Sequence, residues 1–258
     1  MTIAARHSWF MTQRHLRGLL RQPWYVAITL VQPVIWLLLF GALFKSVVEI
    51  PGFTSDSYID FLTPGIVVMT ALFSSGWNGM GMLNDLDRGV VDRFLVSPAQ
   101  RLSLVTGPIT QLAIVIVIQS LIIVALGLAA GASFPGGVPG VLVLIACAVL
   151  LGAALGGLSN GLALLARKEE TLIAAVNFIV LPLTFLSSTF MQESLVPGWI
   201  QDVARVNPVN WAVQAGREAL GASVDWGYVL ARMGGLLAVA VVCGWFAVRA
   251  FRTYQRSV

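Results

Sequence analysis

The chain has 258 residues, of which 57% are hydrophobic and only 11% are charged. Soluble domains carry about 25% charged residues, so this composition excludes a soluble domain and indicates an integral membrane protein. The net charge of +4 follows from membrane topology and indicates no nucleic-acid partner. The two cysteines, Cys147 and Cys243, are too few for a disulfide scaffold or a metal site.

Residues 2–21 predict an amphipathic helix lying in the membrane interface. Apolar residues, including Trp9, gather on one side and arginines, including Arg14, gather on another. The alternative is a frayed basic tail. The segment is Arg-rich throughout and has no small-residue cleavage site, so it is not expected to be a signal peptide.

Six apolar stretches predict membrane-spanning helices. At 1.5 Å per residue, about 20 residues cross the hydrocarbon core. The predicted spans are residues 23–44, 61–83, 102–130, 140–166, 171–190 and 227–248. The expected fold is therefore an all-α integral membrane protein with a single domain over residues 1–258.

The segment 84–101, between the second and third spans, is a charged island with a helical apolar stripe. Leu86, Val90 and Phe94 are spaced at i, i+4 and i+8, and Leu95 lies beside them. The charged residues that lie largely off this stripe are Asp87, Arg88, Asp92 and Arg93. A short amphipathic helix beside a membrane needs a partner for its apolar side, either lipid headgroups or a groove on another protein. The alternative is a solvated connector.

Residues 191–226 are too polar to span a membrane and too apolar for a plain loop. Pro197 can open one short helix, and Asn207 can cap a second that begins at Pro208 and runs to Gly221. The pattern predicts a helical hairpin that dips into the outer membrane surface.

The basic residues predict the orientation. If the N-terminus is inside, twelve Lys and Arg residues fall in inner segments and four in outer segments. The four outer residues are Lys45, Arg205, Arg217 and Arg232. Because basic residues favour the cytoplasmic side, both termini and the charged island are expected to face the cytoplasm.

The predicted spans lack the ionisable residues that ion-driven carriers place in mid-membrane, apart from Arg232 near the outer end of the sixth. Their polar groups include Gln111, Gln119 and Asn177, which more often join helices than bind substrate. They are nevertheless the candidate residues of a substrate pathway. The aspartates of the charged island could hold Mg²⁺, but interleaved arginines favour a solvated face. No catalytic residue or metal site is expected.

The sequence contains no G-x-x-x-x-G-K-[ST] motif, so this chain cannot bind ATP as P-loop proteins do. If transport is active, its energy must come from another chain.

The whole chain resembles the permease subunits of ABC-2 type exporters, and it is similar to the bacterial daunorubicin-resistance-like branch of that family. The stretches that carry the resemblance are YIDFLTPG at 58–65, DRGVVDRFLVSPAQR at 87–101 and NPVNWAVQAGREAL at 207–220. The resemblance implies a multi-pass protein of the bacterial cytoplasmic membrane and a dimer of identical or homologous permeases on two ATPase subunits. ATP and Mg²⁺ would bind to those partners, with no cofactor in this chain.

The resemblance also implies that 84–101 is the coupling helix that contacts the ATPase. The implied function is export of a hydrophobic drug or lipid-like molecule by alternating access. Two alternatives stay open: export of a lipid-linked glycan or cell-envelope lipid, and a membrane scaffold that transports nothing.

Overall fold

The computed structural model describes residues 23–53, 55, 57–89 and 102–255. In these ranges the chain is helical and has no strand. The α-helices are α2 (Pro23–Leu43), α3 (Tyr58–Gly76), α4 (Asn78–Asp87), α6 (Leu102–Ala129), α7 (Gly137–Ala166), α8 (Glu169–Phe185), α9 (Gly198–Val206), α10 (Pro208–Leu220) and α11 (Trp226–Gln255). Two short 3₁₀ helices are η1 (Lys45–Glu49) and η2 (Glu193–Leu195). The expected interfacial helix 2–21 lies outside the described residues.

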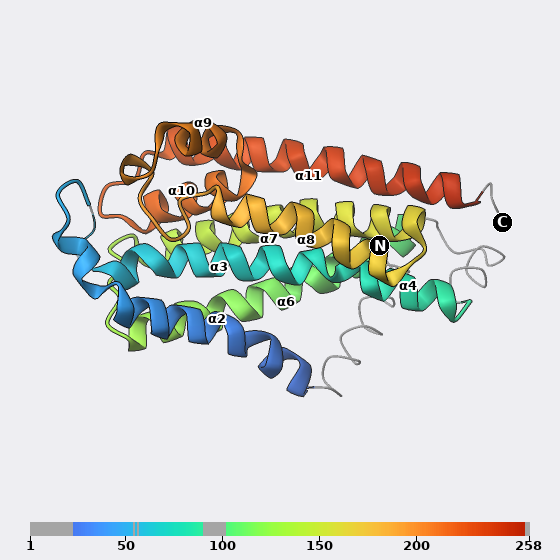
Figure 1. Cartoon of the computed structure of the whole chain (residues 1–258), viewed down its shortest axis with the longest axis horizontal. Coiled ribbons are helices and arrows are strands. Elements are labelled where there is room, and N and C mark those ends of the chain that lie inside the picture. Colours follow the sequence, from blue (N-terminus) through green and yellow to red (C-terminus); the bar gives the residue numbers. More distant parts are fainter. Residues whose placement is uncertain (1–22, 54, 56, 90–101, 256–258) are drawn as a thin grey trace.

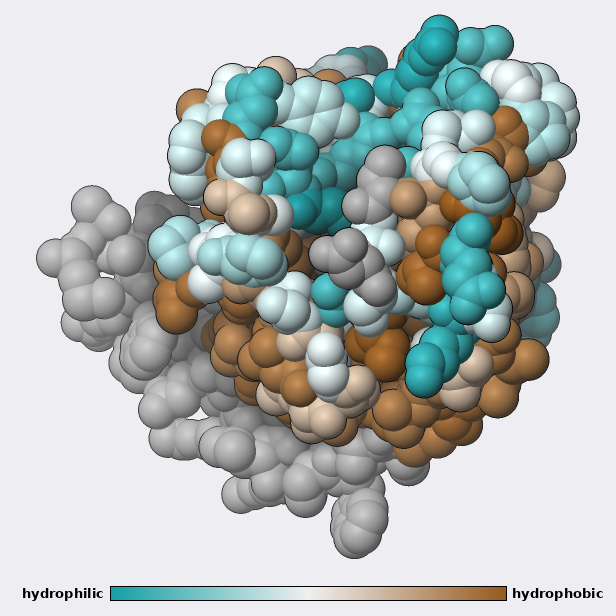
Figure 2. Space-filling view, turned by 90° about the vertical axis from the view of Figure 1, so that its left-hand side faces the viewer, coloured by the Kyte–Doolittle hydropathy of each residue, from teal (hydrophilic) through white to brown (hydrophobic). Residues whose placement is uncertain are grey.

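The long helices run side by side along one axis, with α9 and α10 at one end and α4 at the other (Figure 1). We call these the hairpin end and the α4 end. Viewed from the hairpin end, polar side chains gather on part of the face and apolar ones border it (Figure 2). Large apolar side chains along the bundle are exposed, among them Phe178 of α8 at 81%. This is the surface expected of helices that face lipid.

Four helical stretches are long and apolar enough to cross a membrane: Tyr58–Asp87, Gly107–Ala129, Gly137–Ala166 and Trp226–Tyr254. They correspond to the second, third, fourth and sixth predicted spans. Helix α2 (Pro23–Leu43) agrees with the first predicted span to within one residue, and its part Thr29–Leu43 is apolar. In the fifth, α8 has 17 residues and ends at Phe185, before the predicted end at 190. The structure therefore supports four of the six predicted spans by length and composition.

Helix α7 forms the centre of the bundle and packs against α3, α4, α6, α8, α10 and α11. Small residues let neighbouring backbones approach it closely. One such approach is at the hairpin end, where a Cβ on Gly140 would clash with the carbonyl oxygen of Ala219 in α10. Helix α10 is thus seated directly on the backbone of α7.

The helices of the predicted hairpin are present with the predicted start signals. Helix α9 follows Pro197, and in α10 the side chain of Asn207 accepts a hydrogen bond from the backbone N–H of Val209. Both helices have an apolar face, and α10 buries its face against α7, α11 and α3.

The end of the second predicted span differs from expectation. The sequence predicted one unbroken span over 61–83 and a charged island from Asn84. In the structure α3 ends at Gly76, Trp77 breaks the helix, and α4 continues through Asn84 to Asp87. The beginning of the charged island is therefore the last turn of a helix that extends from the bundle.

Candidate functional site

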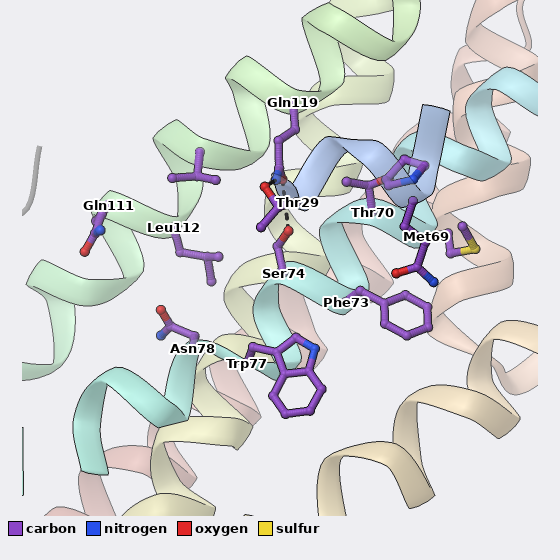
Figure 3. A pocket seen from close by; sticks show the side chains of 13 residues that line it. Thr29, Met69, Thr70, Phe73, Ser74, Trp77, Asn78, Gln111, Leu112 and Gln119 are labelled. Atoms are coloured by element: carbon purple, nitrogen blue, oxygen red, sulfur yellow. Dashed lines mark hydrogen bonds between the residues drawn. The ribbon is translucent and has the colours of Figure 1, made fainter. Parts of the chain in front are cut away.

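A cavity of about 360 Å³ lies between α2, α3, α4 and α6 (Figure 3). Its walls combine aliphatic and aromatic side chains with uncharged polar ones, and none of the described residues lining it is ionisable. The lining residues are Thr29, Gln32, Pro33, Met69, Thr70, Phe73, Ser74, Trp77, Asn78, Gln111, Leu112, Val115 and Gln119. We call this cavity the amide pocket.

Gln119 of α6 holds three helices together at one end of the pocket. Its side chain is 1% exposed. Its Oε1 accepts a hydrogen bond from Ser74 Oγ at 2.9 Å, and its Nε2 donates to Thr29 Oγ1 at 3.1 Å. These contacts, drawn in Figure 3, join α6 to α3 and α2. They agree with the expectation that amides in the spans join helices.

Gln111 lies two turns earlier on the same helix and lines the same pocket. Gln32 of α2 contributes a third amide. Within the described part of the chain, neither Gln111 nor Gln32 makes a hydrogen bond through its side chain. Among the glutamines of the pocket, one is therefore fixed by neighbouring helices and two are not paired in this way.

The break between α3 and α4 forms part of the pocket wall. Ser159 of α7 donates through Oγ to the carbonyl of Gly76 and accepts from the N–H of Gly79 at 3.0 Å. The backbone groups released by the break are thus paired again by a side chain, which apolar surroundings require. The close approach depends on Gly79, because a Cβ there would lie 2.5 Å from the backbone oxygen of Ser159.

Asn78, the first residue of α4, also lines the pocket and fastens the break to α7. Its Nδ2 donates to Oδ1 of the buried Asn160 at 3.2 Å. Because Ser159 and Asn160 are adjacent, two contacts from one turn of α7 hold the start of α4. A displacement of α4 would therefore act on both α7 and the wall of the amide pocket.

A second polar cluster lies at the hairpin end, and Asn207 and Asn210 form one half of it. Asn207 Nδ2 donates to the carbonyls of Leu183 and Leu186, both at 2.8 Å. Asn210 Oδ1 accepts from the backbone N–H of Ser188 at 3.0 Å. The two asparagines thus satisfy backbone groups where α8 ends, which explains how this helix can stop at Phe185 beside a buried core.

Arg217 of α10 forms the other half of this cluster. Its Nε donates to the carbonyl of Phe61 at 3.0 Å, Nη1 to Ser188 Oγ at 3.2 Å, and Nη2 to the carbonyl of Thr189 at 3.1 Å. The guanidinium carbon lies 3.5 Å from the centre of the Phe61 ring, a cation–π contact. No carboxylate pairs with Arg217 in the described part of the chain. We call Asn207, Asn210 and Arg217 the Asn–Arg cluster.

Burial lowers the pKa of Arg217 to about 9, so the guanidinium is protonated at neutral pH. The distribution of basic residues places Arg217 among the outer loop residues and does not predict its burial. A signal was present: Val213, Arg217 and Leu220 share one face of α10 at i, i+4 and i+7, and the two apolar residues are buried.

The structure brings together some of the candidate residues and separates others. Gln111 and Gln119 share the amide pocket, whereas Asn177 does not line it and donates to the carbonyl of Ile173 in its own helix, α8. Of the coupling residues, Leu86 and Asp87 are in the last turn of α4 and Arg88 follows it. The others, Val90, Asp92, Arg93, Phe94 and Leu95, lie outside the described residues.

Comparison with known proteins identifies the family. The profile of the ABC-2 type transporter family matches residues 6–220. The chain is 27% identical over 230 residues to the daunorubicin resistance ABC transporter permease protein DrrB1 of Streptomyces coeruleorubidus, covering 88% of this chain and 78% of that protein. It is also similar to the probable doxorubicin resistance ABC transporter permease protein DrrC of Mycobacterium tuberculosis, with 27% identity over 79% of this chain and 72% of the relative.

A third relative is the putative transport permease ycf38 of Cyanophora paradoxa, with 29% identity over 79% of this chain and 70% of that protein. The family match covers most of the chain and includes the amide pocket and the Asn–Arg cluster. With its apolar helices, this chain belongs to the ABC-2 type transporter family as a multi-pass membrane permease.

Proposed function

We propose that this chain is the permease subunit of an ATP-driven exporter that moves a hydrophobic drug or lipid-like substrate out of the cell by alternating access. A separate ABC ATPase subunit would bind ATP and Mg²⁺, and a second permease, identical or homologous, would complete the transporter. The family match over residues 6–220, with relatives named for daunorubicin and doxorubicin resistance, carries the proposal. The absence of a phosphate-binding Gly-Lys motif from the sequence supports placing the ATPase in another chain.

In the proposed orientation, the α4 end faces the cytoplasm and the hairpin end faces outward. The arrangement of helices supports this. Arg88 directly follows α4, Arg167 directly follows α7, which packs against α4, and Arg249 lies in the C-terminal part of α11, whose last turns lie at the α4 end (Figure 1). Basic residues are favoured on the cytoplasmic side of a membrane.

Labelling of introduced cysteines tests the orientation, in a background without Cys147 and Cys243. We expect a thiol reagent that cannot cross the membrane to label cysteines at Ser55 and Gln192 in intact cells. Cysteines at Asp92 and Glu170 should react only after permeabilisation. Labelling of the Asp92 position in intact cells would contradict the orientation.

The route from the ATPase to the bundle would run through α4. The coupling segment begins in the last turn of α4, so a displacement of this segment would reach Trp77 and Asn78 in the wall of the amide pocket. Through Ser159 and Asn160 it would also reach α7, on which α10 is seated. Such linked packing could convert closure of the ATPases into an outward opening between the two permeases.

The decisive experiment replaces an apolar residue of the coupling segment. Phe94→Asp should abolish ATP-driven efflux while the permease stays in the membrane, because the expected contact is with the ATPase and not with lipid. Removing a buried aromatic side chain costs about 1.5–3 kcal/mol, and an unpaired buried carboxylate adds several more. At about 1.4 kcal/mol per factor of ten, binding would weaken by several orders of magnitude.

The variant is expressed with its ATPase, and membrane level, co-purification of the ATPase and efflux are measured. Arg93→Glu is the matched control, with a smaller expected loss because exposed ion pairs contribute about 0–1 kcal/mol. Normal efflux by Phe94→Asp at a normal membrane level would exclude this segment as the coupling element. A permease that never co-purifies with an ATPase would favour the scaffold alternative.

A further inference from the structure

The amide pocket extends over a considerable depth of the bundle. Gln119 and Gln111 are eight residues apart on α6, which corresponds to about 12 Å along the helix axis. Gln119 lies in the middle of the apolar stretch Gly107–Ala129, and Trp77 lies about two thirds of the way along the stretch Tyr58–Asp87. The pocket therefore runs from the membrane interior toward the α4 end.

The polar groups of the pocket are only partly used by the fold. Thr29 and Ser74 fix the amide of Gln119, so this group is held in one orientation. The amides of Gln111 and Gln32 make no side-chain hydrogen bond within the described residues. An amide in an apolar environment gains from a partner, and a ligand in the pocket would supply one.

The rest of the lining indicates the kind of ligand. Phe73 and Trp77 present aromatic rings, and Leu112 and Val115 add aliphatic surface (Figure 3). No described lining residue is ionisable, so this wall offers no opposite charge to compensate a charged ligand for the water that it loses. The volume of about 360 Å³ is within the range of small-molecule sites.

We propose that the amide pocket of a single permease is a binding site for an uncharged aromatic molecule with hydrogen-bonding groups. In this site Gln111 and Gln32 would bind the polar groups, and Phe73 and Trp77 would pack against the ring system. The inference rests on the proposed function, since such a ligand would be the exporter's substrate, and it adds that the site discriminates against charge. A lipid acyl chain suits the pocket less well, because it would leave both amides unpaired.

The test is equilibrium binding to the full-length permease in nanodiscs, with the signal of empty nanodiscs subtracted. The probe is Nile red, an uncharged aromatic dye with a carbonyl group, and the charged comparison is rhodamine 6G. We expect saturable Nile red binding to the wild type. The rhodamine 6G dissociation constant should be at least about tenfold higher, because burying a charge without an opposite charge beside it costs more free energy than losing one hydrogen bond.

Two variants test the location. Gln111→Met keeps the length of the side chain and should raise the Nile red dissociation constant about three- to tenfold, the effect of one lost hydrogen bond. Val115→Trp fills the cavity and should abolish saturable binding. The matched controls are Asn177→Leu, an amide outside the pocket, and Val242→Trp on an exposed position of α11. Both controls should bind within about twofold of the wild type, because neither touches the pocket.

The inference is overturned if the wild type shows no saturable Nile red binding, if both pocket variants bind like their controls, or if rhodamine 6G binds as tightly as Nile red. If Val115→Trp does not fold, as judged by thermal unfolding, Gln111→Met decides the question. ATP-driven efflux by the wild type with its ATPase is measured in parallel. If the wild type shows no ATP-driven efflux, this counts against the proposed function. The binding data alone decide whether the amide pocket is a binding site.

Discussion

The amide pocket and the Asn–Arg cluster both place polar side chains among apolar helices, but they use those side chains differently. At the hairpin end, Asn207, Asn210 and Arg217 direct hydrogen bonds to specific backbone groups. In the amide pocket Gln119 and Asn78 are held by side chains of neighbouring helices, whereas Gln111 has no such partner in the described residues. A fully paired cluster contributes to the fold, whereas unpaired amides around a cavity are suited to binding.

The two regions also differ in charge. Arg217 brings a full positive charge into the structure and is stabilised by carbonyl oxygens, a hydroxyl and the face of Phe61. The amide pocket has no ionisable group in its described lining. Removing Arg217 should therefore damage the fold, while changes in the pocket should alter binding first.

The largest effect on stability is expected from Arg217→Met. The substitution removes the guanidinium donors from the carbonyls of Phe61 and Thr189 and from Ser188 Oγ, and each buried group left unpaired costs about 1–3 kcal/mol. We expect a loss of about 3 kcal/mol or more and a clearly lower midpoint of thermal unfolding in detergent.

Arg205→Met is the matched control in the neighbouring helix α9. Arg205 pairs with Asp202 at 3.1 Å, but their side chains are 68% and 72% exposed. Such a pair contributes about 0–1 kcal/mol, so the midpoint should barely change. Equal effects of the two substitutions would show that Arg217 does not anchor the hairpin.

An intermediate effect is expected from Ser159→Ala at the break between α3 and α4. The hydroxyl pairs both Gly76 and Gly79, so its loss should cost about 1–3 kcal/mol. Because the break joins the pocket to the coupling segment, efflux should fall more than the membrane level does. Ser74→Ala is a comparison at another polar contact, and a wild-type efflux rate in Ser159→Ala would show that the break transmits no movement.

The smallest effects are expected at Gln119 and Gln111, two of the three glutamines of the pocket. Gln119→Leu removes hydrogen bonds to Thr29 and Ser74 and should destabilise the permease by about 1 kcal/mol. Gln111→Leu removes an amide that has no such bond and should change the unfolding midpoint little, within about 0.5 kcal/mol. If Gln111→Leu destabilised the protein more than Gln119→Leu, Gln111 would have a structural role and the contrast between the two residues would be wrong.

Several features followed from the sequence alone because they depend on local chemistry. Long apolar stretches can satisfy their backbone in a membrane only as helices, which predicted the helical class. Pro197 and the Asn207-Pro208 pair predicted where α9 and α10 begin, since a helix start is decided within a few residues. The family resemblance also rested on short stretches, and the family match confirmed it.

Tertiary structure decided the break at Trp77, the burial of Arg217 and the composition of the pocket. The break is stabilised by Ser159, which is about 80 residues away in the chain, and Gln119 is held by Thr29, 90 residues away. The sequence placed Gln111, Gln119 and Asn177 together as polar residues of the spans, and only packing separated Asn177 from the other two. Periodicity shows which side of a helix is polar. The partner of a polar side chain belongs to a neighbouring helix, and that helix is formed by residues distant in the sequence.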